Sequence, residues 1–115
     1  MPEAAIDLAT FRELQQAAGA DFVVELVDTF VEEAPQMLAE LRAARAFGQA
    51  DRFRRAAHSL KSNGHTFGAL ELAALARELE LKGLDADAQR DAAALDAIDA
   101  AYVRAASALQ ELRHC

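Results

Sequence analysis

The spacing of apolar residues along the chain predicts five helices. In the segment that begins at Asp21, apolar residues return every three or four positions from Phe22 to Leu41, as they do on one face of an α-helix. The same spacing recurs elsewhere, so we expect helices over about residues 7–17, 21–46, 49–66, 69–82 and 88–112. Glycines, which commonly end helices, separate the segments. They are Gly19, Gly48, Gly68 and Gly83.

Short connections between long amphipathic helices favour antiparallel neighbours. The pattern therefore predicts an all-α fold, an antiparallel up-down-up-down four-helix bundle with the short helix of residues 7–17 as a cap at one end. We expect residues 1–115 to form a single domain. Pro35 interrupts the longest segment, and because proline lacks a backbone N–H and clashes with the preceding turn, we expect a kink or a break there.

Composition supports a small helical domain and narrows its partners. The chain has 115 residues, 53% of them hydrophobic and 27% charged, which suffices for one buried core. Its net charge of −7 argues against nucleic acid as a partner. No apolar run approaches the ~20 residues of a membrane span, and the start does not resemble a signal peptide. The one cysteine, Cys115, allows no disulfide framework. We expect a cytoplasmic monomer that does not bind membranes.

The helix expected over residues 49–66 has one polar face, and His58 lies at its centre. On a helical wheel the surrounding polar side chains fall within about 60° of His58. They are Asp51, Arg54, Arg55, Lys61, Ser62 and His65. The apolar side chains fall on the opposite side, with Asn63 at the boundary. They are Phe53, Ala56, Leu60 and Phe67. The pattern therefore predicts that His58 is exposed to solvent and to other proteins.

Positive charge gathers around this histidine. Residues 42–65 contain six Lys and Arg against one acid, Asp51, a local balance of +5 in a chain of −7. Neighbouring cations favour the neutral imidazole, whose lone pair can act as a nucleophile. The same cations would stabilise a phosphoryl group on the ring. Lys61, one helical turn beyond His58, is the best placed of them.

The run from Arg55 to Ala69 resembles the signature of the histidine-containing phosphotransfer (HPt) family. That signature has the form A-H-x-L-K-G, then small residues, then G-A, then a leucine-spaced helix that ends in L-E. The matching residues here are Ala57-His58-Ser59-Leu60-Lys61-Ser62, Gly68-Ala69, Leu72, Leu75 and Leu79-Glu80. The stretch Phe30–Pro35 is similar to the family's second helix, and the resemblance covers about residues 21–82 in all.

The resemblance implies a covalent phosphohistidine carrier in a two-component phosphorelay, without an ATP site of its own. His58 matches the phosphorylated histidine, Lys61 the lysine beside the phosphoryl group, and Glu80 a polar side chain that orients the ring through Nδ1–H. The implied partners are a response-regulator receiver domain, a hybrid histidine kinase or both, with Mg²⁺ supplied by the receiver. Ser62 stands where the family usually has glycine, and His65 where it has a small residue. We assign both, with Arg54 and Arg55, to the surface that docks partners.

His58 also allows other interpretations: a metal ligand, the histidine of a sensor-kinase dimerisation domain, or a residue without chemistry. His58 and His65 lie about 10 Å apart along a helix, too far to share a metal ion, and we expect no metal or cofactor site. A sensor-kinase dimerisation domain would have an acid directly after the histidine and a Thr-Pro beyond it, which Ser59 and Leu60 do not match. Two alternatives remain: a non-catalytic helical interaction module, and a phosphoacceptor domain excised from a hybrid sensor kinase. The Met start leads us to expect a free-standing protein.

Overall fold

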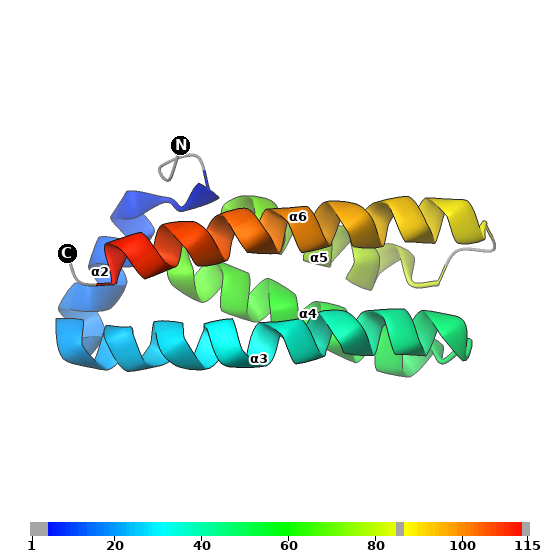
Figure 1. Cartoon of the computed structure of the whole chain (residues 1–115), viewed down its shortest axis with the longest axis horizontal. Helices are drawn as coiled ribbons and strands as arrows, with labels where there is room; N and C mark the ends of the chain where they lie inside the picture. The colour runs from blue at the N-terminus through cyan, green and yellow to red at the C-terminus, as the bar shows by residue number, and fades with distance from the viewer. Residues whose placement is uncertain (1–4, 85–86, 114–115) are drawn as a thin grey trace.

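The computed structural model describes residues 5–84 and 87–113, and these residues form five helices (Figure 1). The helices are α2 (Leu8–Ala18), α3 (Ala20–Ala46), α4 (Ala50–Phe67), α5 (Leu70–Lys82) and α6 (Ala88–Leu112). Their bounds differ by at most one residue from those expected from the apolar spacing. The described residues contain no strand, so the prediction of an all-α protein is confirmed. None of their helices is long and apolar enough to cross a membrane.

Pro35 does not break α3, which is one continuous helix from Ala20 to Ala46 (Figure 1). The expectation of a break there is wrong, while a kink stays a prediction. Ala34 and Leu38 are buried on the inward side of this stretch, whereas Pro35 itself is exposed. A single lost backbone hydrogen bond is outweighed when ending the helix would uncover an apolar stripe that packs against the core.

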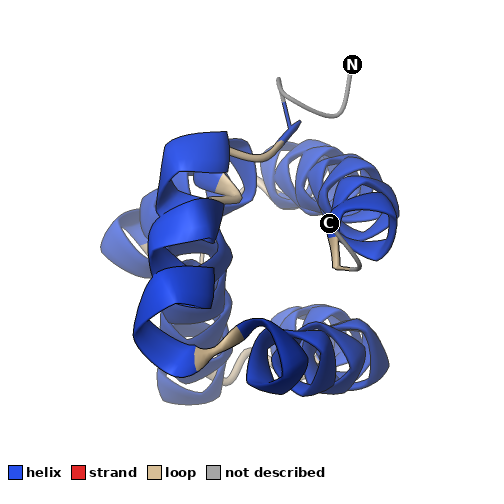
Figure 2. Cartoon of the chain, turned by 90° about the vertical axis from the view of Figure 1, so that its left-hand side faces the viewer, coloured by secondary structure: helices blue, strands red, loops and turns tan. Residues whose placement is uncertain are grey.

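The four longer helices run along the length of the molecule, and α2 lies across one end (Figures 1 and 2). Each of α3, α4 and α5 packs against the next helix in the chain, and α6 packs back against α3, so these helices surround a common core. The α2 helix contacts α3 and α4. The backbone N–H of Asp7 donates to the carbonyl of Gly68 at 2.7 Å, which joins the start of α2 to the α4–α5 turn.

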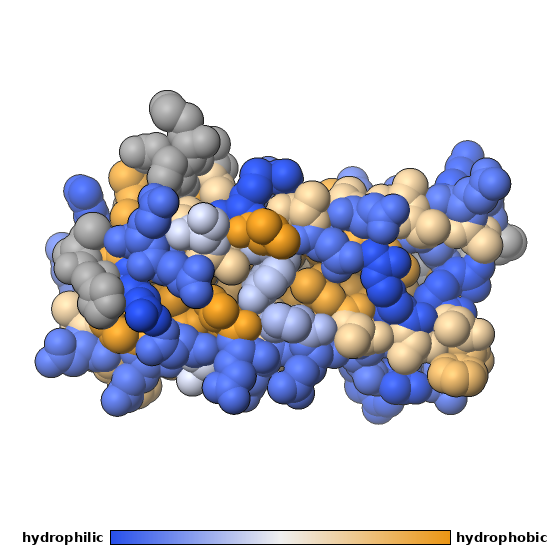
Figure 3. All heavy atoms as spheres, in the orientation of Figure 1, coloured by the Kyte–Doolittle hydropathy of each residue, from blue (hydrophilic) through white to orange (hydrophobic). Residues whose placement is uncertain are grey.

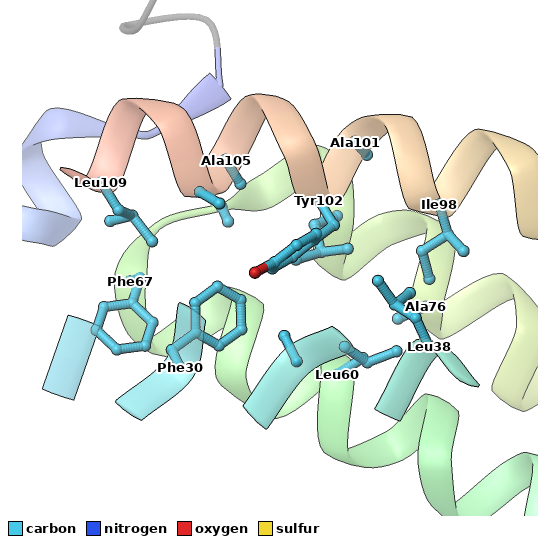
Figure 4. Close-up of a cluster of buried hydrophobic side chains, with 14 of the residues drawn as sticks. Phe30, Leu38, Leu60, Phe67, Ala76, Ile98, Ala101, Tyr102, Ala105 and Leu109 are labelled. Carbon is cyan, nitrogen blue, oxygen red and sulfur yellow. The ribbon is translucent and has the colours of Figure 1, made fainter. Parts of the chain in front are cut away.

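The core is made from the inward stripes of the four long helices (Figure 4). Phe30 of α3 packs against Phe67 of α4 and Tyr102 of α6, with ring centroids 5.2 and 5.8 Å apart. The hydroxyl of Tyr102 donates to the carbonyl of Val31 at 3.0 Å, which satisfies the one polar atom of that side chain. Burial of each large apolar side chain stabilises the fold by about 1.5–3 kcal/mol.

A glycine of α4, Gly64, faces α5 and lets the two helices lie close together. A Cβ on Gly64 would lie 3.1 Å from the Cβ of Ala73, so a larger residue would force the helices apart. The predicted inward face of α4 is buried: Phe53, Ala56, Leu60 and Phe67. Its opposite face, with His58 at the centre, is therefore turned outward beside α5. The two helices meet along residues 54–65 of α4 and along α5 with the Gly83 that follows it. We call this line the α4–α5 seam.

Candidate functional site

His58 projects from the middle of α4 into solvent, with 62% of its side chain exposed. This agrees with its predicted place at the centre of the polar face. The other polar-face residues are exposed as well, except for Lys61, which is partly covered. The exposed ones are Asp51, Arg54, Arg55, Ser62 and His65. A histidine in the middle of a regular helix has a fixed backbone, so its ring stands in a defined position at the surface.

Glu80 of α5 joins His58 and Lys61 through one carboxylate. Its Oε2 lies 2.6 Å from Nδ1 of His58, and the ammonium of Lys61 donates to its Oε1 at 2.7 Å. Glu80 and Lys61 are mostly covered, with 21% and 23% of their side chains exposed. The three side chains come from two helices and form one hydrogen-bonded group that spans the α4–α5 seam.

The protonation of this group follows from the carboxylate. The hydrogen bond from Lys61 is the largest cause that lowers the pKa of Glu80, and the contact with His58 lowers it further against the opposing effect of burial. An ionised carboxylate can only accept hydrogen bonds, so Nδ1 of His58 carries the hydrogen that it donates. In a neutral imidazole this leaves the lone pair on Nε2, where an electrophile can be attacked.

A shallow depression of about 410 Å³ adjoins His58 on the α4–α5 seam. Its lining residues are Arg54, Arg55, His58, Ser59 and Glu80. Arg54 reaches across to the end of α5, where a Cβ on Gly83 would lie 2.9 Å from Nη2 of Arg54. Glycine at position 83 therefore leaves space for a guanidinium beside the site. Arg54 and Arg55 thus bring two positive charges to one side of the imidazole.

The positive patch is smaller than the sequence predicts. Three of the six cations within residues 42–65 are engaged in ion pairs away from His58. The pairs are Arg42 with Asp96 and Asp99, Arg45 with Asp91, and Arg52 with Glu40. The count of +5 therefore overstates the charge beside His58, because Glu40 of α3 and three aspartates of α6 neutralise these arginines. Arg54, Arg55 and Lys61 remain beside the imidazole.

One residue at the surface near the site, Arg77 of α5, was missed by the sequence analysis. With Lys61 and His65 of α4 it lines a groove of about 440 Å³ on the α4–α5 seam, beyond the Lys61–Glu80 contact. The sequence held a signal for it. Arg77 lies three residues before Glu80 in a predicted helix, which puts the two side chains on the same face.

A second surface flanks His58 on the side of α3. It is a groove of about 620 Å³ between α3 and α4 with both acidic and basic residues at its edges. They are Glu32, Glu33, Glu40, Arg52 and Arg55.

Within the described residues, no three His, Cys, Asp or Glu side chains are grouped so as to hold a metal ion. Cys115, on which the expectation about disulfides rests, lies outside the described residues.

Comparison with known proteins adds a family and a solved structure. The family model described as "Hpt domain" matches residues 25–114. The structure is similar to the crystal structure of histidine-containing phosphotransfer protein B from Pseudomonas aeruginosa PAO1. The TM-score is 0.84, the sequences are 28% identical, and the match covers 96% of this chain and 95% of that one. No match was found among curated proteins.

Proposed function

Because the chain belongs to the Hpt domain family and is a histidine phosphotransfer protein of a two-component phosphorelay, we propose that His58 carries the phosphoryl group. One observation supports this assignment above all others. The ring of His58 is exposed, and its Nδ1 is held by the Glu80 carboxylate at 2.6 Å, so Nε2 is the nitrogen left for attack. Family membership favours the carrier over a non-catalytic interaction module.

The proposed transfer forms one bond and breaks one. Nε2 of His58 attacks the phosphorus of a phosphoaspartate on the partner, an N–P bond forms, and the bond from phosphorus to the aspartate oxygen breaks. The electron pair of that bond leaves with the aspartate carboxylate. Because Nδ1 keeps its hydrogen, the phosphorylated ring is a cation, and the adjacent Glu80 carboxylate stabilises it. The reverse reaction returns the phosphoryl group to an aspartate.

The surrounding cations take separate parts in this proposal. Lys61 lies one turn from His58 and is already held near it through Glu80, so it can contact the phosphoryl oxygens with a small movement of its side chain. Arg54 and Arg55 line the depression beside the ring and attract the acidic catalytic centre of the partner. Ser62 and His65 are exposed on the same face and complete the proposed docking surface.

The wider setting of the reaction also belongs to the proposal. Hpt proteins interact with receiver domains and histidine kinases and act as phosphocarriers. We propose that this chain has no ATP site, takes no part in binding nucleic acid, relies on Mg²⁺ held by the receiver, and works as a cytoplasmic monomer. We propose further that α3 to α6 form an antiparallel up-down-up-down bundle capped by α2. The lengthwise course of these four helices and the position of α2 at one end support that arrangement.

Substitution of the histidine tests the assignment. The variant His58→Gln should keep the helical circular dichroism of the parent and lose all labelling by a phosphorylated receiver domain, because glutamine has no nucleophilic ring nitrogen. His65→Gln is the matched control, an exposed histidine of the same helix, and should still accept label at a saturating concentration of the receiver, because a docking residue affects binding and not the phosphoacceptor. Acid-labile label on His58→Gln would show that another residue carries the phosphoryl group.

A further inference from the structure

The arginines of this protein fall into two groups. Six of the ten are in ion pairs with carboxylates: Arg42, Arg45, Arg52, Arg90, Arg104 and Arg113. The other four have no carboxylate within ion-pair distance among the residues that the structure describes: Arg12, Arg54, Arg55 and Arg77. Three of these four lie on the α4–α5 seam. Arg54 and Arg55 adjoin His58, but Arg77 lies in a separate groove on the far side of the Lys61–Glu80 contact.

The groove at Arg77 combines basic and apolar lining residues. Its polar lining residues are Arg77, Lys61 and His65, and its apolar lining residues are Leu70, Ala73 and Ala74. Half of the Leu70 surface is exposed, which is high for a leucine at the start of a helix that packs on its neighbours. Glu80, the carboxylate of α5 that pairs with side chains of α4, is already bound to His58 and Lys61. The groove therefore has cationic groups and an apolar surface that no other part of the described chain covers.

We propose that this groove docks an acidic segment of the protein that exchanges the phosphoryl group with His58. In this arrangement a carboxylate of the partner pairs with Arg77, and an adjacent apolar side chain covers Leu70. The inference rests on the proposed function, since it takes the partner to be the one whose active site covers His58. An exposed leucine beside the cations favours a protein segment over free phosphate, and the net charge of −7 disfavours a nucleic acid.

The distance from the imidazole fits one interface. His65, at the edge of the groove, lies seven residues from His58 on the same helix, or about 10 Å along its axis. A protein interface of ordinary size covers about 800 Å² on each partner, which spans both points. Arg77 would therefore act on binding and not on the chemical step. It determines which partners dock, because a charge at the edge of an interface mainly changes encounter and specificity.

Charge reversal at Arg77 tests this inference. The experiment compares Arg77→Glu with Arg12→Glu, a matched control in which an exposed arginine of α2 undergoes the same change. The receiver domain used is one that labels the wild-type protein, and its concentration is varied. Arg77→Glu should raise the KM for the phosphorylated receiver about tenfold, equivalent to about 1.4 kcal/mol of docking energy, with kcat within about twofold of wild type. Arg12→Glu should change neither value.

Two further measurements separate docking from chemistry and from folding. Labelling by phosphoramidate, a small phosphoryl donor that needs no docking surface, should be unchanged in Arg77→Glu. Arg77→Lys, which keeps the charge, should return the KM to within about threefold of wild type, since rim contacts at exposed positions depend mainly on charge.

An unchanged KM in Arg77→Glu would overturn the inference, and so would a loss of phosphoramidate labelling, which would assign Arg77 to the reacting centre. Neither result would touch the assignment of His58. That assignment fails only if His58→Gln still accepts label. In that case another residue carries the phosphoryl group, and the KM values of Arg77→Glu and Arg12→Glu can still be compared on that residue.

Discussion

Two seams of this bundle use arginine in opposite ways. On the α3–α6 seam, formed by residues 28–45 of α3 and 91–112 of α6, Arg42 and Arg45 are paired with carboxylates of α6. On the α4–α5 seam, Arg54 and Arg77 have no such partner among the described residues. Figure 3 views the α3–α6 side, where hydrophilic residues follow both helices and apolar atoms show in the furrow between them.

The difference lies in the acids opposite each arginine and not in the arginines themselves. Helix α6 turns Asp91, Asp96 and Asp99 toward α3, so the cations there join two helices. Helix α5 offers α4 one carboxylate, Glu80, which His58 and Lys61 share. On the α3–α6 seam the arginines are neutralised by ion pairs that join the two helices. On the α4–α5 seam positive charge stays available to a phosphoryl group or to another protein.

The largest effect expected on this comparison comes from Arg45→Ala. Asp91 is only 4% exposed, and Nε of Arg45 lies 2.6 Å from its carboxylate, so the variant removes a cation that lies against a buried carboxylate. We expect a loss of about 3 kcal/mol in the free energy of unfolding, measured by urea denaturation. Arg54→Ala, the control on the other seam, should change that energy by less than about 0.5 kcal/mol. If Arg45→Ala and Arg54→Ala lost the same free energy of unfolding, the arginines of the two seams would not differ in their contribution to stability.

A smaller effect on the same seam is expected from Tyr102→Phe. The variant keeps the ring packed against Phe30 but removes the hydroxyl that donates to the carbonyl of Val31. The expected loss is about 1 kcal/mol in the free energy of unfolding, the usual value of one buried hydrogen bond. Phosphotransfer measured well below the unfolding temperature should be unchanged. A slower transfer would mean that the α3–α6 seam is coupled to the site across the core.

The smallest effect on stability, and one that depends on pH, is expected from Glu80→Gln. The pKa of Glu80 is held below its ordinary value of 4.5, chiefly by Lys61, so the ionised form is the one that the fold stabilises. Its contribution is complete above about pH 4.5 and is lost as the pH falls through the lowered pKa. The difference in urea midpoint between wild type and Glu80→Gln should therefore be full near pH 7 and shrink toward about pH 3. A difference that did not vary with pH would mean that the carboxylate charge adds nothing to the seam.

The fold was largely predictable because its signals are local. Apolar spacing and separating glycines depend on neighbours in the chain, and they located the ends of α2 to α6 to within one residue. Gly68 illustrates this, since it adopts a left-handed conformation with φ of 80° at the end of α4. At Pro35 the sequence left both a kink and a break open, for the opposite reason. Its effect depends on what the rest of α3 buries, which a local rule does not contain.

The site was predictable only in part. The exposure of His58 followed from the helical wheel, and the place of Glu80 came from the family resemblance. The pairing of Arg42 with Asp96 joins residues 54 positions apart, and no pattern within a helix indicates such a contact. Arg77 lies outside the charged stretch around His58, so only its spacing of three residues from Glu80 indicates its place beside the site.

The division of α4 into an inward apolar face and an outward polar face bears on how such proteins diverge. Phe53 and Leu60 are fixed by packing, whereas Arg54, Arg55 and His65 touch little that the bundle needs. Substitutions on the outward face therefore change the stability of the fold little, while they alter the side chains around His58 that a partner contacts. After a gene duplication, two copies can drift to separate signalling routes without either losing its scaffold. Insulation between parallel pathways can thus evolve at the surface of a single helix.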